Sequence, residues 1–254
     1  MKSYTFAPAP YFRAALSLII GLISTTSIAA DLTAYTNDWP PYNFEDNKQV
    51  TGISTDIFMS ACTEAKLSCV TELVPWARAY ATVSKTPNTV LYTTARIPSR
   101  ETEFLWVGPL LPRVTWVYGR AGTQERFKTL QDLATAKVGV VRGESSIKDL
   151  EAAGIPASAF VNDSANHFVL RSLEAGMVDA MVDTEIGMAW NLREMNYPES
   201  SVTKLMKLSD GGAYYFALNK ATPVEIQTRL QTALEKLRQS GAIARIIRKY
   251  SGNK

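Results

Sequence analysis

Histidine and cysteine are scarce in this sequence, whose 254 residues include one His, at position 167, and two Cys. Catalytic triads and most zinc sites use histidine, and two thiols alone do not complete a tetrahedral zinc site. Because His167 stands far from both cysteines along the chain, we expect no metal centre and no cofactor. We expect His167 itself to be an ordinary surface or helix residue.

The sequence also lacks any block of consecutive basic residues. Its formal net charge is +3, and residues 1–30 contribute Lys2 and Arg13 but no acidic residue. Without those residues the net charge falls to about +1. Proteins that bind nucleic acid usually present a cluster of Lys and Arg side chains. We therefore expect no nucleic acid among the partners.

Long hydrophobic runs are absent except near the start of the chain. A charged segment there is followed by an apolar run over residues 14–23 and then by small residues up to Ala30. This order is typical of a secretory signal peptide. The run is shorter than the roughly 20 apolar residues of a transmembrane helix, and a retained membrane anchor is the alternative. We predict cleavage after Ala29 or Ala30 and a periplasmic mature protein.

The two cysteines stand close together, at positions 62 and 69. In an oxidising compartment such a pair indicates a disulfide that closes a short loop, here Cys62–Cys69. Two free buried thiols are the alternative interpretation.

Short strands alternate with helices beyond residue 31, and this βαβαβ pattern occurs twice, which predicts α/β structure with doubly wound sheets. A helix is expected over residues 56–66 with Thr55 or Asp56 as its N-cap, and a long amphipathic helix over residues 223–241. The expected strands are residues 32–36, 68–74, 88–95, 137–143, 178–183 and 212–220. The other expected helices are residues 76–84, 129–136, 144–154, 167–176 and 184–195.

Residues 37–47, NDWPPYNFEDN, place two prolines between Trp39 and Tyr42. Proline fixes its own φ angle and keeps the preceding residue extended, so the two aromatic side chains are held at a set angle. The loop either packs these aromatics into the core or forms a rigid aromatic wall for a small ligand.

Five segments of the chain follow one another in an order typical of a known family. They are WPPYNFEDNKQVTGISTDI, TTARIPSRETEFLWVGP, KVGVVRGESS, LEAGMVDAMVD and GAIARIIRKY. On these segments the sequence resembles the periplasmic solute-binding proteins of polar amino-acid ABC importers, the family 3 extracellular solute-binding proteins. The resemblance extends from about Leu32 to Tyr250. Some members carry a disulfide where this chain has its cysteine pair.

The resemblance implies the type II periplasmic binding protein fold, in which two doubly wound α/β lobes are joined by two crossover strands. We expect the crossings near residues 116–120 and 216–219. The first lobe would then consist of residues 31–117 and 217–254, and the second of residues 118–216. The ligand would be trapped in the cleft between the lobes, which close around it.

The resemblance also implies a set of ligand-binding residues. Arg100 matches the family arginine that grips the α-carboxylate, for which a guanidinium offers two parallel hydrogen bonds; a surface pair with Glu101 or Glu103 is the alternative. Arg96 is a possible second cation or a solvated side chain. The remaining matches are Trp39 as an aromatic cover, Trp76 in an apolar pocket, Thr93 on the cleft wall and Ser145 at a helix start.

The acid that would hold an α-ammonium departs from the family pattern. The usual position aligns with Thr184, while Asp183 stands one residue earlier. A shift of one residue in a strand turns a side chain to the other face, so Asp183 serves only if the strand end re-aims it. Another frequent acid position is occupied by Ser54.

Three functions are compatible with these observations. The expected one is non-catalytic binding of a small polar solute, most simply an amino acid, by a monomer that delivers it to an ABC permease. The second is an enzyme on the same scaffold, similar to a dehydratase, with Glu144 or Asp183 as its acid or base. The third is a soluble sensory subunit that reports its ligand to a separate membrane receptor, since no signalling segment is expected before Lys254.

Overall fold

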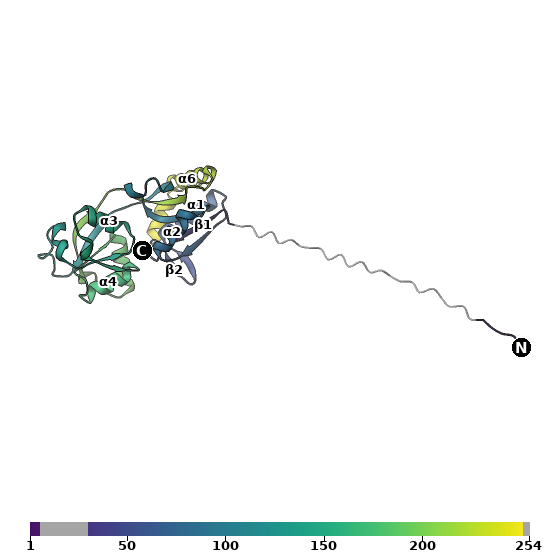
Figure 1. Ribbon diagram of the computed structural model, residues 1–254, viewed down its shortest axis with the longest axis horizontal. Coiled ribbons are helices and arrows are strands. Elements are labelled where there is room, and N and C mark those ends of the chain that lie inside the picture. The colour runs from purple at the N-terminus through teal and green to yellow at the C-terminus, as the bar shows by residue number, and fades with distance from the viewer. Residues whose placement is uncertain (6–29, 251–254) are drawn as a thin grey trace.

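The computed structural model describes residues 1–5 and 30–250 and shows two lobes (Figure 1). The middle of the chain, drawn in teal and green, forms one lobe, while the blue early elements and the yellow final helices form the other. The apolar part of the predicted signal peptide lies outside the described residues. Among the residues that are described, no helix is both long enough and apolar enough to cross a membrane.

The first lobe contains a five-stranded sheet. Its strands are β1 (Leu32–Thr36), β4 (Cys69–Leu73), β5 (Thr89–Ala95), β6 (Phe104–Pro112) and β12 (Ala213–Asn219). The spatial order is β4-β1-β5-β12-β6. β1 is parallel to β4 and β5, whereas β12 is antiparallel to β5 and β6. The predicted parallel sheet is thus confirmed for the first three strands and completed by antiparallel strands.

Helices cover both faces of this sheet. They are α1 (Ile53–Glu64), α2 (Trp76–Lys85), α6 (Val224–Gln239) and α7 (Ala242–Tyr250). Val90 of β5 packs with α1, α6 and α7, whereas its neighbour Leu91 packs with α2, because successive strand residues point to opposite faces. A small hairpin of β2 (Phe44–Asp46) and β3 (Gln49–Thr51) precedes α1.

The second lobe repeats this plan. Its strands are β7 (Thr115–Arg120), β8 (Val138–Val141), β9 (Phe160–Asp163), β10 (Ala180–Asp183) and β11 (Val202–Ser209), in the order β11-β7-β10-β8-β9. β8 is parallel to β9 and β10, and β7 is antiparallel to β10 and β11. The helices are α3 (Ser145–Ala152), α4 (Asn166–Glu174) and α5 (Glu185–Glu194), with short 3-10 helices η2 (Leu130–Thr135), η3 (Ala157–Ala159) and η4 (Glu199–Ser201).

Three elements of the second lobe differ from the sequence expectation. The segment expected as an α-helix over residues 129–136 forms the 3-10 helix η2, whose start is held by reciprocal hydrogen bonds between Thr129 and Asp132. β9 and β11 were not predicted. β11 consists of residues that are mostly half-buried, so its sequence lacks the regular alternation of a one-sided strand.

The chain passes between the two sheets twice, at residues 113–114 and 210–212. Both passages come just before the strands expected to cross, since β7 pairs within the second sheet and β12 within the first. The passages also lie side by side. The Arg113 N–H donates to the Gly212 carbonyl at 3.2 Å, Pro112 is paired with Ala213, and Ser209 is paired with Thr115.

Helix α1 begins at Ile53, three residues before the predicted start, and neither Thr55 nor Asp56 is its N-cap. The N–H groups of Ile53 and Ser54 instead donate to the carbonyls of Pro41 and Tyr42 at 2.8 Å each. Gly52 allows this contact, because its φ is +121° and a Cβ there would lie 2.5 Å from the Tyr42 carbonyl oxygen. The aromatic loop therefore caps the helix, which no side-chain pattern could reveal.

The predicted disulfide is confirmed between Cys62 of α1 and Cys69 of β4, with their Cα atoms 6.2 Å apart. It ties the end of the helix to the edge strand that follows it.

The last described residue, Tyr250, joins α7 to the start of α1. Its hydroxyl accepts the Gly52 N–H at 3.1 Å, lies 2.9 Å from the Thr51 hydroxyl, and donates to Asp56 at 2.8 Å. Lys249 donates to the same Asp56 carboxylate at 2.8 Å. The tyrosine ring is buried beside Phe44. The C-terminal helix therefore stabilises the segment from which the aromatic loop leads into α1.

We predict that Tyr250→Phe lowers the free energy of unfolding by about 1–3 kcal/mol, because it leaves buried hydrogen-bonding groups without their partner. Chemical denaturation measures the change. Tyr197→Phe is the matched control, since no hydrogen bond of the Tyr197 hydroxyl is found among the described residues. Equal stability of the two variants would contradict the role given to Tyr250.

Candidate functional site

One cavity lies between the lobes, where about 460 Å³ is not filled by protein atoms, including space open to solvent. Six of the seven residues predicted to bind ligand line it together: Trp39, Trp76, Thr93, Arg100, Ser145 and Asp183. Sequence reasoning did not assign the other residues of its wall to a ligand: Asn37, Ala95, Thr115, Glu144, Ser146, Asn166, Val182, Thr184 and Tyr214.

Arg96 is the predicted ligand residue that does not line this cavity. Its guanidinium forms an ion pair with Glu101 and lies 5.7 Å and 5.3 Å from the ring centres of Trp106 and Tyr215. With a side chain 38 % exposed, it belongs to the outer surface of the first lobe. Arg96 therefore matches the alternative interpretation, a solvated side chain, and we do not retain Arg96 as a ligand-binding residue.

Arg100 has the opposite environment. It ends the 3-10 helix η1 (Pro98–Arg100) and is only 8 % exposed. Its guanidinium donates to the Gly143 carbonyl at 3.1 Å and lies 5.6 Å and 5.4 Å from the rings of Trp76 and Tyr80. Burial lowers the pKa of Arg100. The surface pair with Glu101 or Glu103 does not form, and the arginine points its charge into the cleft.

The aromatic loop performs both of the tasks considered for it. Trp39 packs against Tyr42 and Tyr214, with ring centres 4.6 Å and 5.4 Å away, and belongs to the core of the first lobe. It also lines the cavity, where its buried indole N–H interacts with the Asp183 carboxylate and lowers the pKa of that group. The core packing fixes the ring, and the fixed ring forms a wall of the site.

Thr93 marks a strained point in the first lobe. Its φ is +59°, a left-handed conformation that is costly for a β-branched residue, on the order of 1–3 kcal/mol. The pairing of β12 with β5 and β6 is irregular beside it. The Thr93 hydroxyl donates to the Asn43 side-chain carbonyl at 2.5 Å, which ties the cavity wall to the aromatic loop.

Asp183 ends β10 and faces the cavity, as the sequence hypothesis required. One carboxylate oxygen accepts the Thr184 N–H at 2.7 Å and the Asn166 amide at 3.3 Å, and the other accepts the Asn191 amide at 3.3 Å. A Cβ at Gly187 would lie 2.5 Å from the first oxygen, so glycine there makes room for the carboxylate. Burial raises the pKa of Asp183 to about 7, although the Thr184 N–H lowers it.

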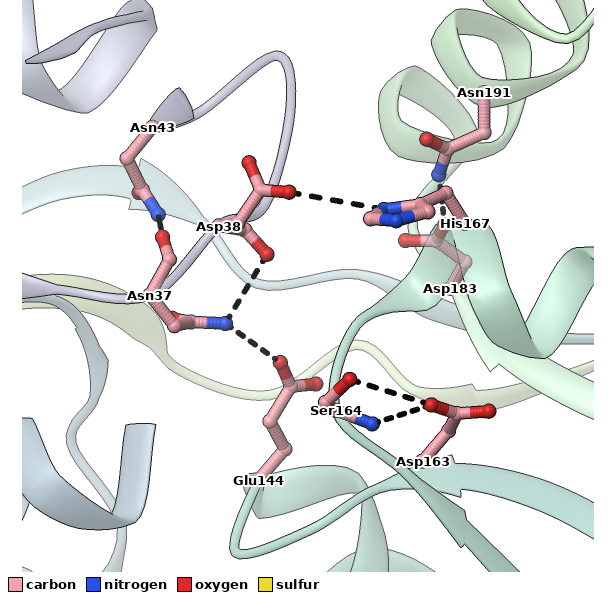
Figure 2. A network of polar contacts seen from close by, with 9 residues as sticks. All are labelled: Asn37, Asp38, Asn43, Glu144, Asp163, Ser164, His167, Asp183 and Asn191. Carbon is pink, nitrogen blue, oxygen red and sulfur yellow. Dashed lines mark hydrogen bonds and ion pairs between the residues drawn. The ribbon is translucent and has the colours of Figure 1, made fainter. Parts of the chain in front are cut away.

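Glu144 is the second carboxyl group of the cavity and precedes α3, whose first residues Ser145 and Ser146 also line the wall. One oxygen accepts a long hydrogen bond, 3.5 Å, from the Asn37 amide across the cleft (Figure 2). Burial, with a smaller contribution from the charge of Asp183, raises the pKa of Glu144 to about 8. The cavity thus places two acids, of which Glu144 accepts one long hydrogen bond and Asp183 accepts three, opposite one arginine.

Polar contacts join the two lobes around the cavity. The Trp76 indole donates to the Gly143 carbonyl at 3.0 Å, and the Tyr42 hydroxyl donates to the Thr184 hydroxyl at 3.0 Å. On the other side of the cleft, Asp38 lies 3.7 Å from His167 (Figure 2). His167 lies in helix α4, as expected of a surface or helix residue, and it also takes part in the interlobe contact. The structure is a closed arrangement of the lobes.

The family of the protein follows from comparison with known sequences. The model for bacterial extracellular solute-binding proteins, family 3, matches residues 32–253, nearly the whole chain beyond the predicted leader. The chain belongs to this family. Comparison with curated proteins finds no match.

Solved structures share the fold of this solute-binding protein. A histidine kinase sensor domain similar to periplasmic binding proteins matches with a TM-score of 0.77 and 19% identity, over 87% of this chain and 96% of the other. An ancestral arginine-binding protein bound to arginine matches with a TM-score of 0.76 and 20% sequence identity, over 87% of this chain and 98% of the other. The ancestral protein AncCDT-1, a precursor of cyclohexadienyl dehydratase, matches with a TM-score of 0.74 and 18% sequence identity, over 86% of this chain and 94% of the other. These likenesses confirm the two-lobed fold.

Within the described part of this solute-binding protein, no cluster of His, Cys, Asp or Glu side chains is arranged to hold a metal ion.

We predict that Glu144→Gln stabilises the ligand-free protein more at pH 9 than at pH 5. A carboxyl whose pKa rises from 4.5 to about 8 on folding binds its proton more tightly in the folded state. Its contribution to the free energy of unfolding therefore falls as the pH rises through this window. Glutamine does not titrate, so the advantage of the variant should grow by about 1–3 kcal/mol, less than the full pKa shift because the lobes can open.

Thermal unfolding of both proteins at the two pH values measures this difference. Glu199→Gln, at an exposed position of the same lobe, is the control and should behave alike at both. A stability difference between Glu144→Gln and the unsubstituted protein that does not change with pH would contradict the burial of an ionisable Glu144.

Proposed function

We propose that this family 3 protein binds a small polar solute, an amino acid, between its lobes and delivers it outside the cytoplasm to an ABC permease. The observation that supports this most strongly is the charge arrangement of the cavity. A buried arginine of the first lobe, together with a buried and a half-buried carboxyl group of the second, lines the same space. A zwitterion supplies the complementary charges, because each buried charge needs a partner.

Arg100 binds the α-carboxylate in this proposal. Its guanidinium has several N–H groups and can form two parallel hydrogen bonds to a carboxylate. In the structure its contacts are one backbone carbonyl and two aromatic rings, which leave donors for a ligand. The start of α3, at Ser145 and Ser146, adds backbone N–H groups and the positive end of a helix dipole on the same cavity wall.

Asp183 binds the α-ammonium in this proposal. The three N–H donors around it hold the carboxylate in place, and an ionised carboxylate still offers lone pairs to a further donor. Trp39 and Trp76 enclose the ligand from the first lobe. The unpartnered hydroxyl of Thr115 is available as an additional polar contact.

The location and the partner follow from the family and the predicted leader. The family is one of extracellular solute-binding proteins, and residues 1–30 have the pattern of a cleaved signal peptide, so we place the protein in the periplasm as a monomer. Similar structures include amino-acid ABC transporter substrate-binding proteins and a histidine kinase sensor domain. A separate membrane receptor is therefore the alternative partner.

We predict that Arg100→Ala raises the dissociation constant for the amino-acid ligand at least about 30-fold, the usual cost of removing one partner of a buried charge pair. A thermal-shift screen against amino acids, organic acids and polyamines first identifies the ligand. At 100 times its dissociation constant a ligand adds about 2.7 kcal/mol of stability. Calorimetry then compares the variants.

Arg96→Ala is the matched control, because Arg96 stands four residues away in the same loop but outside the cavity. It should bind as the unsubstituted protein does. Unchanged affinity in Arg100→Ala, or equal losses in both variants, would contradict the assignment of the carboxylate to Arg100.

A second candidate function is catalysis, favoured by Glu144. A carboxyl group with a pKa of about 8 is protonated at neutral pH and is able to act as a general acid on a bound solute. We expect binding without turnover. After prolonged incubation of protein and ligand, mass spectrometry should recover the ligand unchanged. Appearance of a product that is absent with Glu144→Gln would establish the enzyme instead.

A further inference from the structure

The cavity contains more negative than positive groups. Among the described residues that line it, Glu144 and Asp183 are the acids and Arg100 is the only Arg or Lys. Arg100 forms no ion pair with either acid, since its nearest hydrogen-bond partner is the Gly143 carbonyl. A zwitterionic amino acid would bring one ammonium and one carboxylate. It would therefore leave one of the two acids without a counter-charge.

The two acids differ in how well the protein compensates them. Asp183 accepts three hydrogen bonds, from the Thr184 N–H and from two asparagine amides. It also stands at the start of α5, where the helix dipole favours a negative charge. Glu144 accepts one hydrogen bond of 3.5 Å, from Asn37. Glu144 is therefore the group that most needs a cation.

Nearby cations of the protein do not meet this need. Arg113 approaches from the crossing segment, but it forms an ion pair with Asp149 of α3 and donates to the Ser209 hydroxyl. Lys148 of α3 is paired with Glu151 at 2.8 Å. Both side chains are thus engaged by other acids.

Glu144 also lies where a long ligand side chain would arrive. It lines the cavity and, at the same time, an adjoining outer pocket, whose wall also includes Trp76, Tyr80, Arg100 and Lys148. An aliphatic chain that leaves the cavity along the Trp76 ring therefore ends beside the Glu144 carboxylate. An aromatic ring next to a carboxylate suits a cation, which gains from both.

We infer that Glu144 determines specificity by pairing with a cation at the end of the ligand side chain, so that the solute is a dibasic α-amino acid. This inference rests on the proposed function, in which Arg100 and Asp183 hold the α-carboxylate and the α-ammonium. It adds the third charged contact and the class of amino acid. In the bound state Glu144 is ionised and paired, rather than protonated.

Calorimetric titration with matched pairs of ligands tests the inference. L-lysine is compared with L-norleucine and L-arginine with L-citrulline, because each pair differs mainly in the side-chain charge. We expect the dibasic member of at least one pair to bind at least about 30-fold more tightly. Norleucine or citrulline binding as tightly as its dibasic counterpart would overturn the inference and leave amino-acid binding intact.

The variant Glu144→Gln tests whether the preference for dibasic ligands depends on the Glu144 carboxylate. It keeps the shape of the side chain and removes the charge, so the dibasic ligand should bind at least tenfold more weakly while its neutral counterpart changes less than threefold. Glu199→Gln, at an exposed position of the second lobe outside the cavity, should retain the full selectivity. Equal weakening of both ligands in Glu144→Gln would overturn the role of this carboxylate.

A failure of the proposed function would have a different appearance. If the unsubstituted protein binds none of these four amino acids but binds another amino acid in the thermal-shift screen, the inference is overturned and the proposed function stands. If it binds no amino acid in that screen, or binds cadaverine as tightly as lysine, then the carboxylate contact with Arg100 is wrong and both proposals are overturned. Loss of lysine binding in Asp183→Asn, with selectivity lost only in Glu144→Gln, supports the division of tasks between the two acids.

Discussion

Two carboxyl groups and one guanidinium lie between the lobes without an ion pair among them. Each of these charges is costly in the closed form and inexpensive when the lobes are apart, because water then solvates it. The free energy that resists closure is therefore concentrated on the groups that recognise the solute. A solute of complementary charge removes this penalty as it binds. Recognition and closure are in this sense one event, and the conditions that favour one favour the other.

The first lobe holds its side of the cleft through the aromatic loop. The loop carbonyls of Pro41 and Tyr42 cap α1, Asn43 accepts the hydroxyl of the strained Thr93, and Trp39 packs on Tyr214 of β12. Tyr250 of the final helix fixes the residues that follow the loop. The wall of the site is thus connected to three separate parts of the chain. A surface so restrained loses little conformational entropy when a ligand binds.

Much of this arrangement could be predicted from the sequence, because strands, helices and the order of family segments are local properties. β1 spans the predicted residues 32–36, and six predicted ligand residues line one cavity. Arg96 and Arg100 could not be separated, since the short η1 turn alone sends one outward and the other into the cleft. The start of α1 depends on carbonyls of the loop, and the compensation of Asp183 depends on Asn166 and Asn191 of two different helices. Such contacts are decided by tertiary structure.

The two passages between the lobes lie side by side and are joined by a hydrogen bond from Arg113 to Gly212, between paired residues on either side. Mechanically they form one short ribbon rather than two independent tethers. A hydrogen-bonded ribbon bends readily out of its plane but resists sliding of one strand along the other. We therefore expect the lobes to rotate mainly about one hinge axis, with little twisting or sliding of one lobe against the other. An outer surface that spans both lobes therefore changes shape when the lobes close around a solute.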